Sequence, residues 1–210
     1  MNNLYIFDLD GTLIDSKIVV YECYKKVIIK LIPDRIGEVD SMLIGPSLAE
    51  SAAQLLGKNN MHLLDEFIKM FISIHDNRML DRIVRFEHAD RLLKFLFKGG
   101  HTIMIATNKR SYPTLKIVEQ FGWTKYFVDI FSANETVSKE EGVGKLLKTN
   151  SNTEFKEMFF IGDTVSDGLI AAKYDMKFLR AKYGYGEKEN WLKVKIFQDI
   201  NSLDEIISIN

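Results

Sequence analysis

The chain has 210 residues, of which 46% are hydrophobic and 27% are charged, and its formal net charge is −1. This composition is typical of a globular protein with one core and at most a small accessory domain, and it excludes a protein that coats nucleic acid, which needs a strong basic excess. No apolar run approaches the roughly 18 residues of a membrane span, and the single cysteine, Cys23, excludes an internal disulfide, so we expect a cytoplasmic protein in which Cys23 packs in a helix.

The first predicted elements are a short strand and a long helical segment. Residues 4–7 are all apolar or aromatic, which favours a buried strand. Apolar residues then recur at three- and four-residue steps over residues 18–32, 48–56 and 62–80, and this spacing predicts three helices. No strand pattern interrupts them, so residues 16–82 are predicted to form a small all-helical cap domain inserted after the first strand.

From residue 90 onward, predicted helices and strands alternate. The helices cover residues 92–96, 114–121, 141–148, 168–174 and 203–207, and the strands cover 101–106, 127–131, 158–161, 177–180 and 195–197. This alternation is typical of α/β proteins, whose ligands bind at the carboxyl ends of the strands. We therefore predict a Rossmann-like parallel sheet with helices on both faces, formed by residues 1–15 and 83–210.

Two carboxylates, Asp8 and Asp10, directly follow the first predicted strand. Residues two apart at a strand end point the same way, so both are expected to face one spot above the sheet edge. Anions this close repel each other unless a cation lies between them, and a hard cation such as Mg²⁺ binds carboxylate and carbonyl oxygens. Gly11 then allows a sharp turn. Asp-x-Asp-Gly is also common in plain turns, so the rest of the chain must decide.

Further polar residues follow the second and fourth predicted strands. Thr107 directly follows the second, and its hydroxyl, together with the N–H groups of Asn108 and Lys109, can hold a phosphoryl oxygen. Asp163 follows the fourth and can complete the oxygen shell of a metal ion, with Asp167 one helical turn later. Each pattern alone is also compatible with a helix cap. Together they fall where α/β proteins bind ligands.

Four segments together resemble the haloacid dehalogenase-like hydrolases, most of which are phosphatases. DLDGTLIDS at residues 8–16 is similar to the first motif of that family, Thr107 occupies the second, and GDTVSD at residues 162–167 matches the fourth, Gly-Asp-x-x-x-Asp. Lys139 is the candidate for the lysine of the third motif, with Lys145 as the alternative.

The resemblance extends to the phosphoglycolate phosphatase-like subgroup. The helical insertion, Thr107-Asn108-Lys109 and the YFVD sequence at residues 126–129 are similar to that subgroup, which carries a helical cap. The chain departs from the pattern in two places. Glu140 follows the candidate lysine where relatives often have proline, and FEHA at residues 86–89 replaces a Pro-Gly. The first departure bears on the choice of Lys139 for the third motif, whereas the second changes a loop and touches no catalytic position.

The resemblance implies a phosphatase mechanism. Asp8 would attack phosphorus and form an aspartyl-phosphate, and Asp10 would protonate the leaving oxygen and later activate water. The groups expected to hold the transferred phosphate are Thr107, Asn108, Lys109 and Lys139.

The same resemblance implies a bound Mg²⁺. Its expected ligands are the Asp8 carboxylate, the Asp10 carbonyl and Asp163, while Asp167 would reach a metal-bound water or Lys139. The substrate is expected to be a small phosphorylated metabolite.

Other functions remain open at this point. A sugar-phosphate mutase or a pyrophosphatase would use the same chemistry, and an idle family member could serve as a binding protein. The sequence leaves open whether the protein is a monomer or a homodimer. Candidate contacts to the substrate beyond the phosphate are Pro46, Ser47, Arg78, Arg82 and Arg85.

Overall fold

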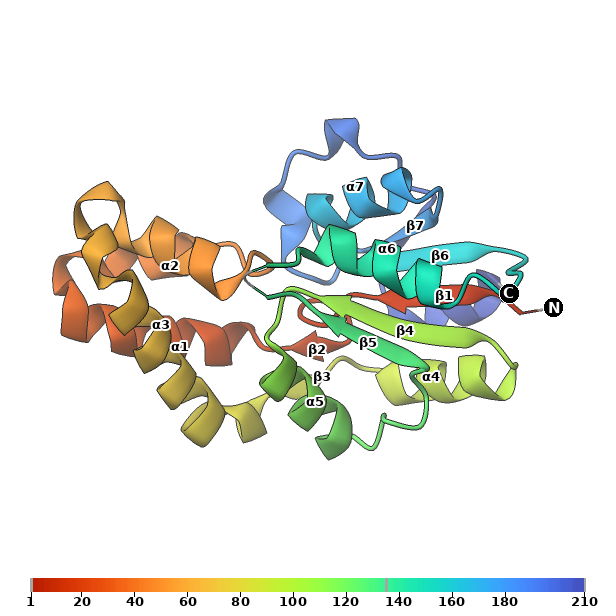
Figure 1. The fold of residues 1–210 in the computed structure, drawn as a ribbon, viewed down its shortest axis with the longest axis horizontal. Helices are drawn as coiled ribbons and strands as arrows, with labels where there is room; N and C mark the ends of the chain where they lie inside the picture. Colours follow the sequence, from red (N-terminus) through yellow and green to blue (C-terminus); the bar gives the residue numbers. More distant parts are fainter. Residues whose placement is uncertain (1, 135, 210) are drawn as a thin grey trace.

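Six parallel strands form the central sheet of the computed structural model, which describes residues 2–134 and 136–209 except for the side chains of residues 78 and 79 (Figure 1). The strands are β1 (Leu4–Phe7), β4 (Thr102–Thr107), β5 (Asp129–Ser132), β6 (Met158–Gly162), β7 (Lys177–Ala181) and β8 (Gln198–Ile200). Their order across the sheet is β5-β4-β1-β6-β7-β8, so β1 lies between β4 and β6. The carboxyl ends of these three strands therefore meet at one place.

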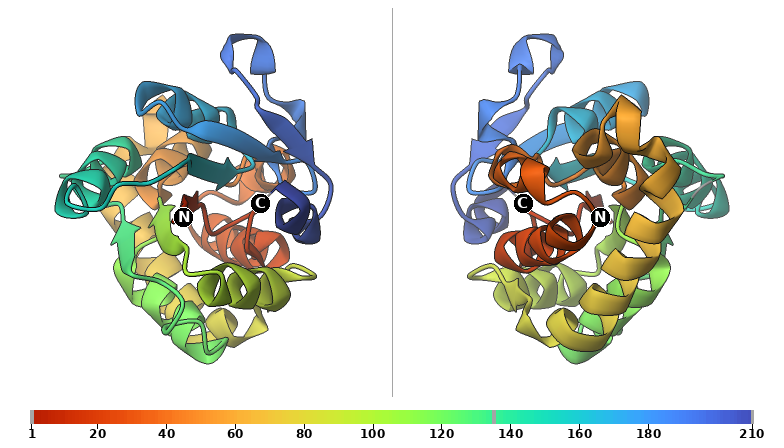
Figure 2. Two further views of the ribbon diagram at one scale, coloured as in Figure 1. Left: turned by 90° about the vertical axis from the view of Figure 1, so that its right-hand side faces the viewer. Right: turned by 90° about the vertical axis from the view of Figure 1, so that its left-hand side faces the viewer.

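Helices cover both faces of the sheet, as the sequence predicts. Tyr5 and Phe7 of β1 pack on one face, which is covered by α4 (Ala89–Lys98), α5 (Ser111–Gln120) and a 3-10 helix at Leu203–Ile209. Leu4 and Ile6 pack on the other face, against α6 (Lys139–Thr149) and α7 (Val165–Lys173). Figure 2 shows the two layers when the molecule is viewed along the strands. Burial on both faces explains why the whole of β1 is apolar.

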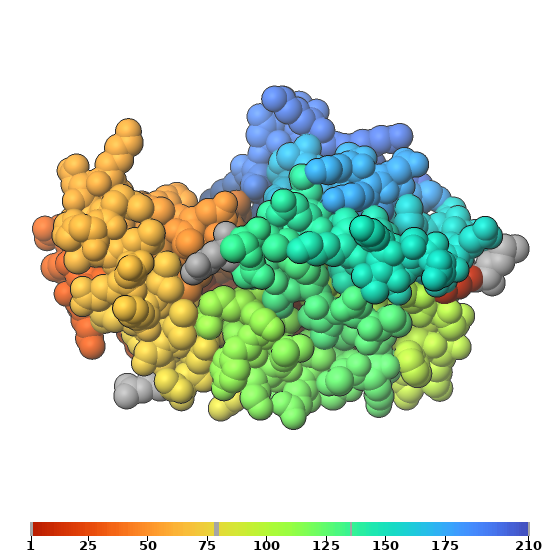
Figure 3. Space-filling view, in the orientation of Figure 1, coloured from red at the N-terminus to blue at the C-terminus, as the bar shows by residue number. Residues whose placement is uncertain are grey.

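Residues 16–83 fold as helices and short connections and lie beyond the carboxyl ends of the strands (Figures 1 and 3). We call residues 16–83 the helical insertion. Its elements are α1 (Lys17–Leu31), a 3-10 segment (Pro33–Ser41), α2 (Leu48–Leu56), a second 3-10 segment (Lys58–Leu63), α3 (Leu64–Ile74), a π-helical turn (His75–Met79) and a 3-10 turn (Leu80–Arg82). The predicted helix over residues 62–80 is thus an α-helix only in its middle part.

Aromatic packing forms the centre of the insertion. The ring of Tyr24 lies 6.1 Å from that of Phe67 and 4.9 Å from that of Phe71, measured between centroids. Cys23 is fully buried beside them, and burial raises the pKa of its thiol to about 12. The thiol therefore stays protonated and serves packing, as expected. Among the described residues, no helix combines the length and apolar character needed to cross a lipid bilayer.

A two-stranded antiparallel ribbon joins the insertion to the rest of the chain. It consists of β2 (Ile14–Asp15) and β3 (Val84–Arg85), with Ile14 paired to Arg85 and Asp15 to Val84. The sequence pattern does not predict this ribbon, because two residues are too few to show a strand period. The ribbon brings the entry and exit of the insertion side by side.

The last strand was predicted at residues 195–197, which is three residues too early. The strand there is β8 at Gln198–Ile200, which pairs with the end of β7. Phe197 precedes it and is 49% exposed, whereas Ile196 packs against the face covered by α6 and α7. Ile196 thus packs against the helices instead of pairing in the sheet. The residues that pair with β7 are Gln198, Asp199 and Ile200, two of which are polar. Apart from the helix predicted over residues 62–80, the other predicted boundaries lie within three residues of those observed, and those of β1 and α2 coincide.

Candidate active site

The turn after β1 brings the first two predicted site residues to the edge of the sheet. The Asp8 N–H donates to the Ile161 carbonyl at 2.8 Å, which continues the ladder between β1 and β6. Gly11 then adopts a φ of +82°, and a Cβ at this position would collide with the Asp163 carboxylate. Glycine is therefore required for the turn to approach the end of β6.

Lys139 is the cation at the centre of the site. Its Nζ lies 2.5 Å from Asp8 Oδ1 and 2.6 Å from Asp167 Oδ1, and all three side chains are buried. Two helix N-termini fix this geometry. Lys139 is the first residue of α6, and Asp167 belongs to a capping box that begins α7, in which its Oδ2 accepts from the Thr164 N–H at 3.0 Å. Lys145, the alternative lysine, is exposed.

Three carboxylates share the pocket around this lysine. Oxygens of Asp8, Asp163 and Asp167 lie within 4.8 Å of one another. Burial raises the pKa of Asp8 to about 7 and holds that of Asp163 well above its usual range. Burial also disfavours the charge of Lys139, but Asp167 and Asp8 outweigh it and raise the lysine pKa. One ammonium does not neutralise three carboxylates, and a set of hard oxygen donors with excess negative charge fits Mg²⁺.

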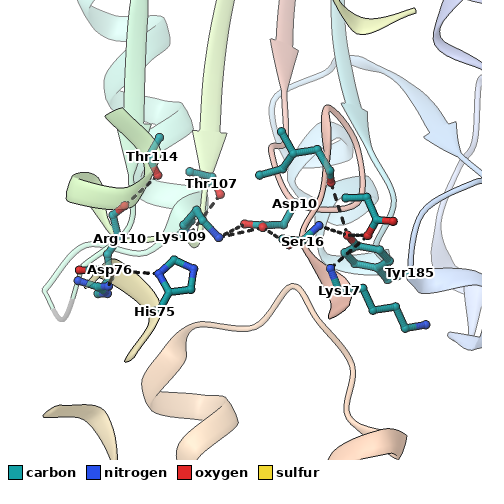
Figure 4. Close-up of polar contacts among 12 residues, drawn as sticks. Asp10, Ser16, Lys17, His75, Asp76, Thr107, Lys109, Arg110, Thr114 and Tyr185 are labelled. Carbon is teal, nitrogen blue, oxygen red and sulfur yellow. Dashed lines mark hydrogen bonds and ion pairs between the residues drawn. The ribbon is translucent and has the colours of Figure 1, made fainter. Parts of the chain in front are cut away.

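The Asp10 carboxylate is not one of these three and has partners of its own. Lys109 Nζ lies 2.9 Å from its Oδ1 and 3.2 Å from its Oδ2, and the Ser16 hydroxyl donates to Oδ1 (Figure 4). The Asp10 side chain lines the cavity between the sheet and the insertion that is described below, whereas its main chain lies in the same turn as that of Asp8.

Tyr185 connects the two halves of the site. Its N–H donates to Asp163 Oδ2 at 2.6 Å. Its hydroxyl accepts from the Ser16 N–H at 2.8 Å and donates to Asp15 Oδ1 at 2.9 Å (Figure 4). The sequence analysis assigned no role to Tyr185, because it lies in a loop after β7 without a motif. Ser16, the partner of the Tyr185 hydroxyl, is the last residue of the first motif, and this position was the only sequence signal that pointed to the contact.

Thr107 is the last residue of β4, on the other side of β1, and Asn108 follows it. Thr107 is buried, and its Oγ1 accepts from the Lys109 N–H at 3.1 Å. The Asn108 side chain turns to the insertion and donates to the Gly45 carbonyl at 2.8 Å. The structure therefore places Thr107 and Lys109 near Asp8 and Asp10, whereas Asn108 joins core and insertion.

A cavity of about 70 Å³ lies between these groups and the insertion. Arg110, which lines this cavity just before α5, forms an ion pair with Asp76 of the insertion at 2.6 Å. His75 Nδ1 lies 2.8 Å from the same carboxylate (Figure 4). The sequence analysis missed this group of three residues. The residues lining the cavity include Asp8, Asp10, Thr107, Lys109 and Arg110 from the core and Tyr24, Ile44, Ser51, Phe71 and His75 from the insertion.

The predicted contacts of the insertion divide into two groups. Pro46 lines the cavity, and Ser47 caps α2 beside it. Arg82 instead pairs with Glu22 at 2.6 Å on the surface, and Arg85 pairs with Asp90 at 3.1 Å. The side chain of Arg78 lies outside the described part of the chain.

Comparison with known proteins places this site in a family. A family model described as haloacid dehalogenase-like hydrolase matches residues 5–181. The chain is 29% identical over 203 residues to a phosphoglycolate phosphatase of Vibrio parahaemolyticus, covering 89% of this chain and 86% of the relative. It is 23% identical over 167 residues to the pyrophosphatase PpaX of Listeria welshimeri, covering 77% and 75%.

A solved structure shares the fold of the whole chain. The crystal structure of a predicted phosphatase from Clostridium acetobutylicum matches with a TM-score of 0.86 at 23% identity, covering 100% of this chain and 98% of that one. The family match extends from β1 to β7 and includes every strand end that carries a site residue. The chain therefore belongs to the haloacid dehalogenase-like hydrolases and resembles their phosphoglycolate phosphatase-like subgroup.

Proposed function

We propose that this hydrolase is a Mg²⁺-dependent phosphatase that cleaves a small phosphorylated metabolite through an aspartyl-phosphate on Asp8. The observation that carries the proposal is the separation of the two motif carboxylates. Asp8 lies beside Lys139 in the buried cluster, whereas Asp10 faces Lys109 and Ser16 at the cavity. Two carboxylates in contrasting environments at one cavity suit a nucleophile and an acid–base group. The relatives named phosphatase and pyrophosphatase support phosphate as the group transferred.

The proposed reaction has two displacements at phosphorus. An Asp8 oxygen forms a bond to phosphorus while the bond to the ester oxygen breaks, and Asp10 gives its proton to that leaving oxygen. A water then attacks the phosphorus of the aspartyl-phosphate, Asp10 takes its proton, and phosphate leaves. Lys139 and Thr107 orient the phosphoryl oxygens and stabilise their charge throughout.

The Mg²⁺ site would use the buried carboxylates described above. Asp8 and Asp163 would bind directly, with the Asp10 carbonyl, and Asp167 would support Lys139 and a bound water. When bound, Mg²⁺ would offset the repulsion between the Asp8 carboxylate and an incoming phosphate dianion.

We further propose that residues 16–82 act as a cap that closes over the cavity. Two contacts support a closed arrangement, the hydrogen bond from Asn108 to Gly45 and the ion pair between Arg110 and Asp76. The β2–β3 ribbon is the proposed hinge. Closure would exclude bulk water from the aspartyl-phosphate until the leaving group departs.

Radiolabelled acetyl phosphate tests the proposal, because acetate leaves without needing a proton. In the presence of Mg²⁺, wild type should turn over, Asp8→Asn should neither acquire label nor release phosphate, and Asp10→Asn should acquire label and lose it slowly. Asp65→Asn, an exposed carboxylate of α3, is the matched control and should behave as wild type. Labelling of Asp8→Asn, or full turnover with the metal chelated, would contradict the mechanism.

The same assay separates the remaining alternatives. Pyrophosphate as the best substrate would indicate a pyrophosphatase, and transfer of label to a second sugar hydroxyl would indicate a mutase. An idle binding protein would acquire no label from any phosphate donor.

A further inference from the structure

The wall of the cavity opposite the catalytic groups is apolar and uncharged. It consists of Val20 and Tyr24 of α1, Ile44 of the loop before α2, Leu48 at the start of α2, and Phe71 of α3. The Tyr24 hydroxyl hydrogen-bonds the buried Ser51 side chain, so the polar atoms of this wall are neutral as well. If the proposed phosphatase function holds, this wall faces the leaving group of the substrate.

The cations at the cavity are already paired with carboxylates. Among the described residues that line it, Lys109 lies 2.9 Å from Asp10 and Arg110 lies 2.6 Å from Asp76. The Asp76 side chain is only 10% exposed, so it cannot turn into water to release Arg110. A second anionic group on the substrate would thus compete with a buried carboxylate of the protein.

His75 adds a hydrogen-bond acceptor to this wall. Its Nδ1 lies 2.8 Å from Asp76 Oδ1, and a carboxylate accepts, so Nδ1 carries the proton. Stacking on Phe71, with centroids 5.5 Å apart and planes 13° from parallel, fixes the ring. Burial lowers the pKa of His75 to about 4, with Lys109 adding to the effect, so the ring is neutral at pH 7. Nε2, on the side of the ring away from Asp76, is then an acceptor (Figure 4).

We propose that the substrate is a phosphate monoester of a small uncharged alcohol with a second hydroxyl group, and that His75 selects it by accepting a hydrogen bond from that hydroxyl. A carboxylate or a second phosphate at this point would face the acceptor Nε2 and an apolar wall without an unpaired cation. This selection differs from what the names of the relatives suggest.

A matched pair of substrates tests the inference. 2-Hydroxyethyl phosphate and 2-phosphoglycolate share one skeleton and differ in a terminal hydroxymethyl or carboxylate group. We expect wild type to prefer the hydroxyl ester by roughly tenfold or more in kcat/KM, and to cleave pyrophosphate more slowly still, since a site built for a hydroxyl discriminates strongly against groups it cannot pair. Acetyl phosphate serves as the reference for phosphatase activity.

Two variants make the test specific. His75→Asn retains a donor near the Nδ1 position for Asp76 but removes Nε2, and it should lower kcat/KM for the hydroxyl ester by roughly tenfold while reducing the preference toward unity. Leu48→Arg, at a half-buried position of the wall, adds a cation and should shift the preference toward 2-phosphoglycolate. Circular dichroism checks that both variants fold.

The outcomes distinguish the two proposals. A preference for 2-phosphoglycolate or pyrophosphate in wild type overturns the inference and leaves the phosphatase standing. If His75→Asn folds and keeps the preference for the hydroxyl ester, the role of His75 is overturned. If His75→Asn does not fold, Leu48→Arg decides, and an unchanged preference in Leu48→Arg overturns the role of the uncharged wall. Failure to cleave any of the esters, acetyl phosphate included, overturns the phosphatase itself.

Discussion

Lys139 is the residue on which the buried cluster depends most directly. Lys139→Met should lower phosphate release by at least about 10³-fold, because it removes the charge that faces the transferred oxygens in the proposed mechanism. Without Mg²⁺ it should also lower the free energy of unfolding by about 3–5 kcal/mol, since breaking a buried ion pair leaves uncompensated charge. Phosphate release and denaturant unfolding measure the two effects.

Lys145→Met is the matched control for this prediction. Lys145 lies on the same helix but is exposed, so its replacement should change stability by no more than about 0.5 kcal/mol. If activity depended on Lys145 and not on Lys139, the assignment of the motif lysine would be reversed.

His75 predicts a pH dependence of stability. Its pKa is about 4 in the folded protein, below the ordinary value of 6.5, so between these values the unfolded chain binds more protons. The neutral ring's contribution to stability is therefore complete above pH 6.5 and is lost as the pH falls toward 4. The expected loss is at most about 3 kcal/mol, from about 1.4 kcal/mol per pKa unit.

Urea unfolding of wild type and His75→Asn between pH 4.5 and 7.5 measures this dependence. Carboxylates common to both proteins cancel in the difference, which should widen as the pH rises toward 6.5. A constant difference over this range would show that His75 does not titrate with a lowered pKa.

At the residue scale, the sequence predicts the groups of the candidate site at the strand ends better than the groups around them. Asp8, Thr107 and Asp163 follow strands that prove to be neighbours, so a parallel sheet was enough to bring them together. His75 and Tyr185 lie in a helical turn and a loop without strand-end positions or motifs. Their place depends on how the insertion and the loop after β7 pack, which periodicity does not specify.

At the scale of elements, the turn after β1 carries a testable requirement. Gly11→Ala should destabilise the protein by more than about 2 kcal/mol, because it adds left-handed strain of about 1–2 kcal/mol to a collision with Asp163. It should also impair phosphate release, since Asp163 must move. Thermal unfolding and steady-state kinetics provide the readouts.

Gly122→Ala separates strain from collision. Gly122 has a φ of +68°, but a Cβ there would meet nothing within 4 Å. It should show the strain alone, about 1–2 kcal/mol, with unchanged kinetics. Equal effects of the two substitutions would mean that close contact with Asp163 is unimportant.

The alternation of elements was predictable because each helix and strand has enough residues to reveal its period. The β2–β3 ribbon was not, since each strand has two residues, and β8 was misplaced because its pairing residues are mostly polar. Both errors concern strands fixed by pairing partners distant in sequence rather than by their own pattern.

At the scale of the whole molecule, contacts on either side of the cavity hold the insertion against the core. Asn108→Ala removes the donor to Gly45 and should raise amide hydrogen exchange around residues 44–52 by about tenfold, the equivalent of a hydrogen bond worth roughly 1–1.5 kcal/mol. Exchange in β4 should not change. Mass spectrometry of exchanged peptides resolves the two regions.

Asn150→Ala provides the control, because Asn150 also donates to a backbone carbonyl, that of Leu146 at 2.9 Å, but within the core. Its replacement should leave exchange in the insertion unaltered. Equal exchange in Asn108→Ala and wild type would indicate that other contacts keep the insertion in place.

The β2–β3 ribbon allows the insertion to be replaced by another segment without disturbing the core. Since Ile14 pairs with Arg85 and Asp15 with Val84, the chain leaves and re-enters the core at adjacent points. To the sheet, the whole insertion is equivalent to the loop of a hairpin, and the entropy of closing a loop rises only slowly with its length. Segments of different size and sequence can thus replace one another there without altering the catalytic edge. Under the proposed function, the substrate range can then diverge during evolution by changes in one continuous stretch of the chain, while the residues at the strand ends stay the same.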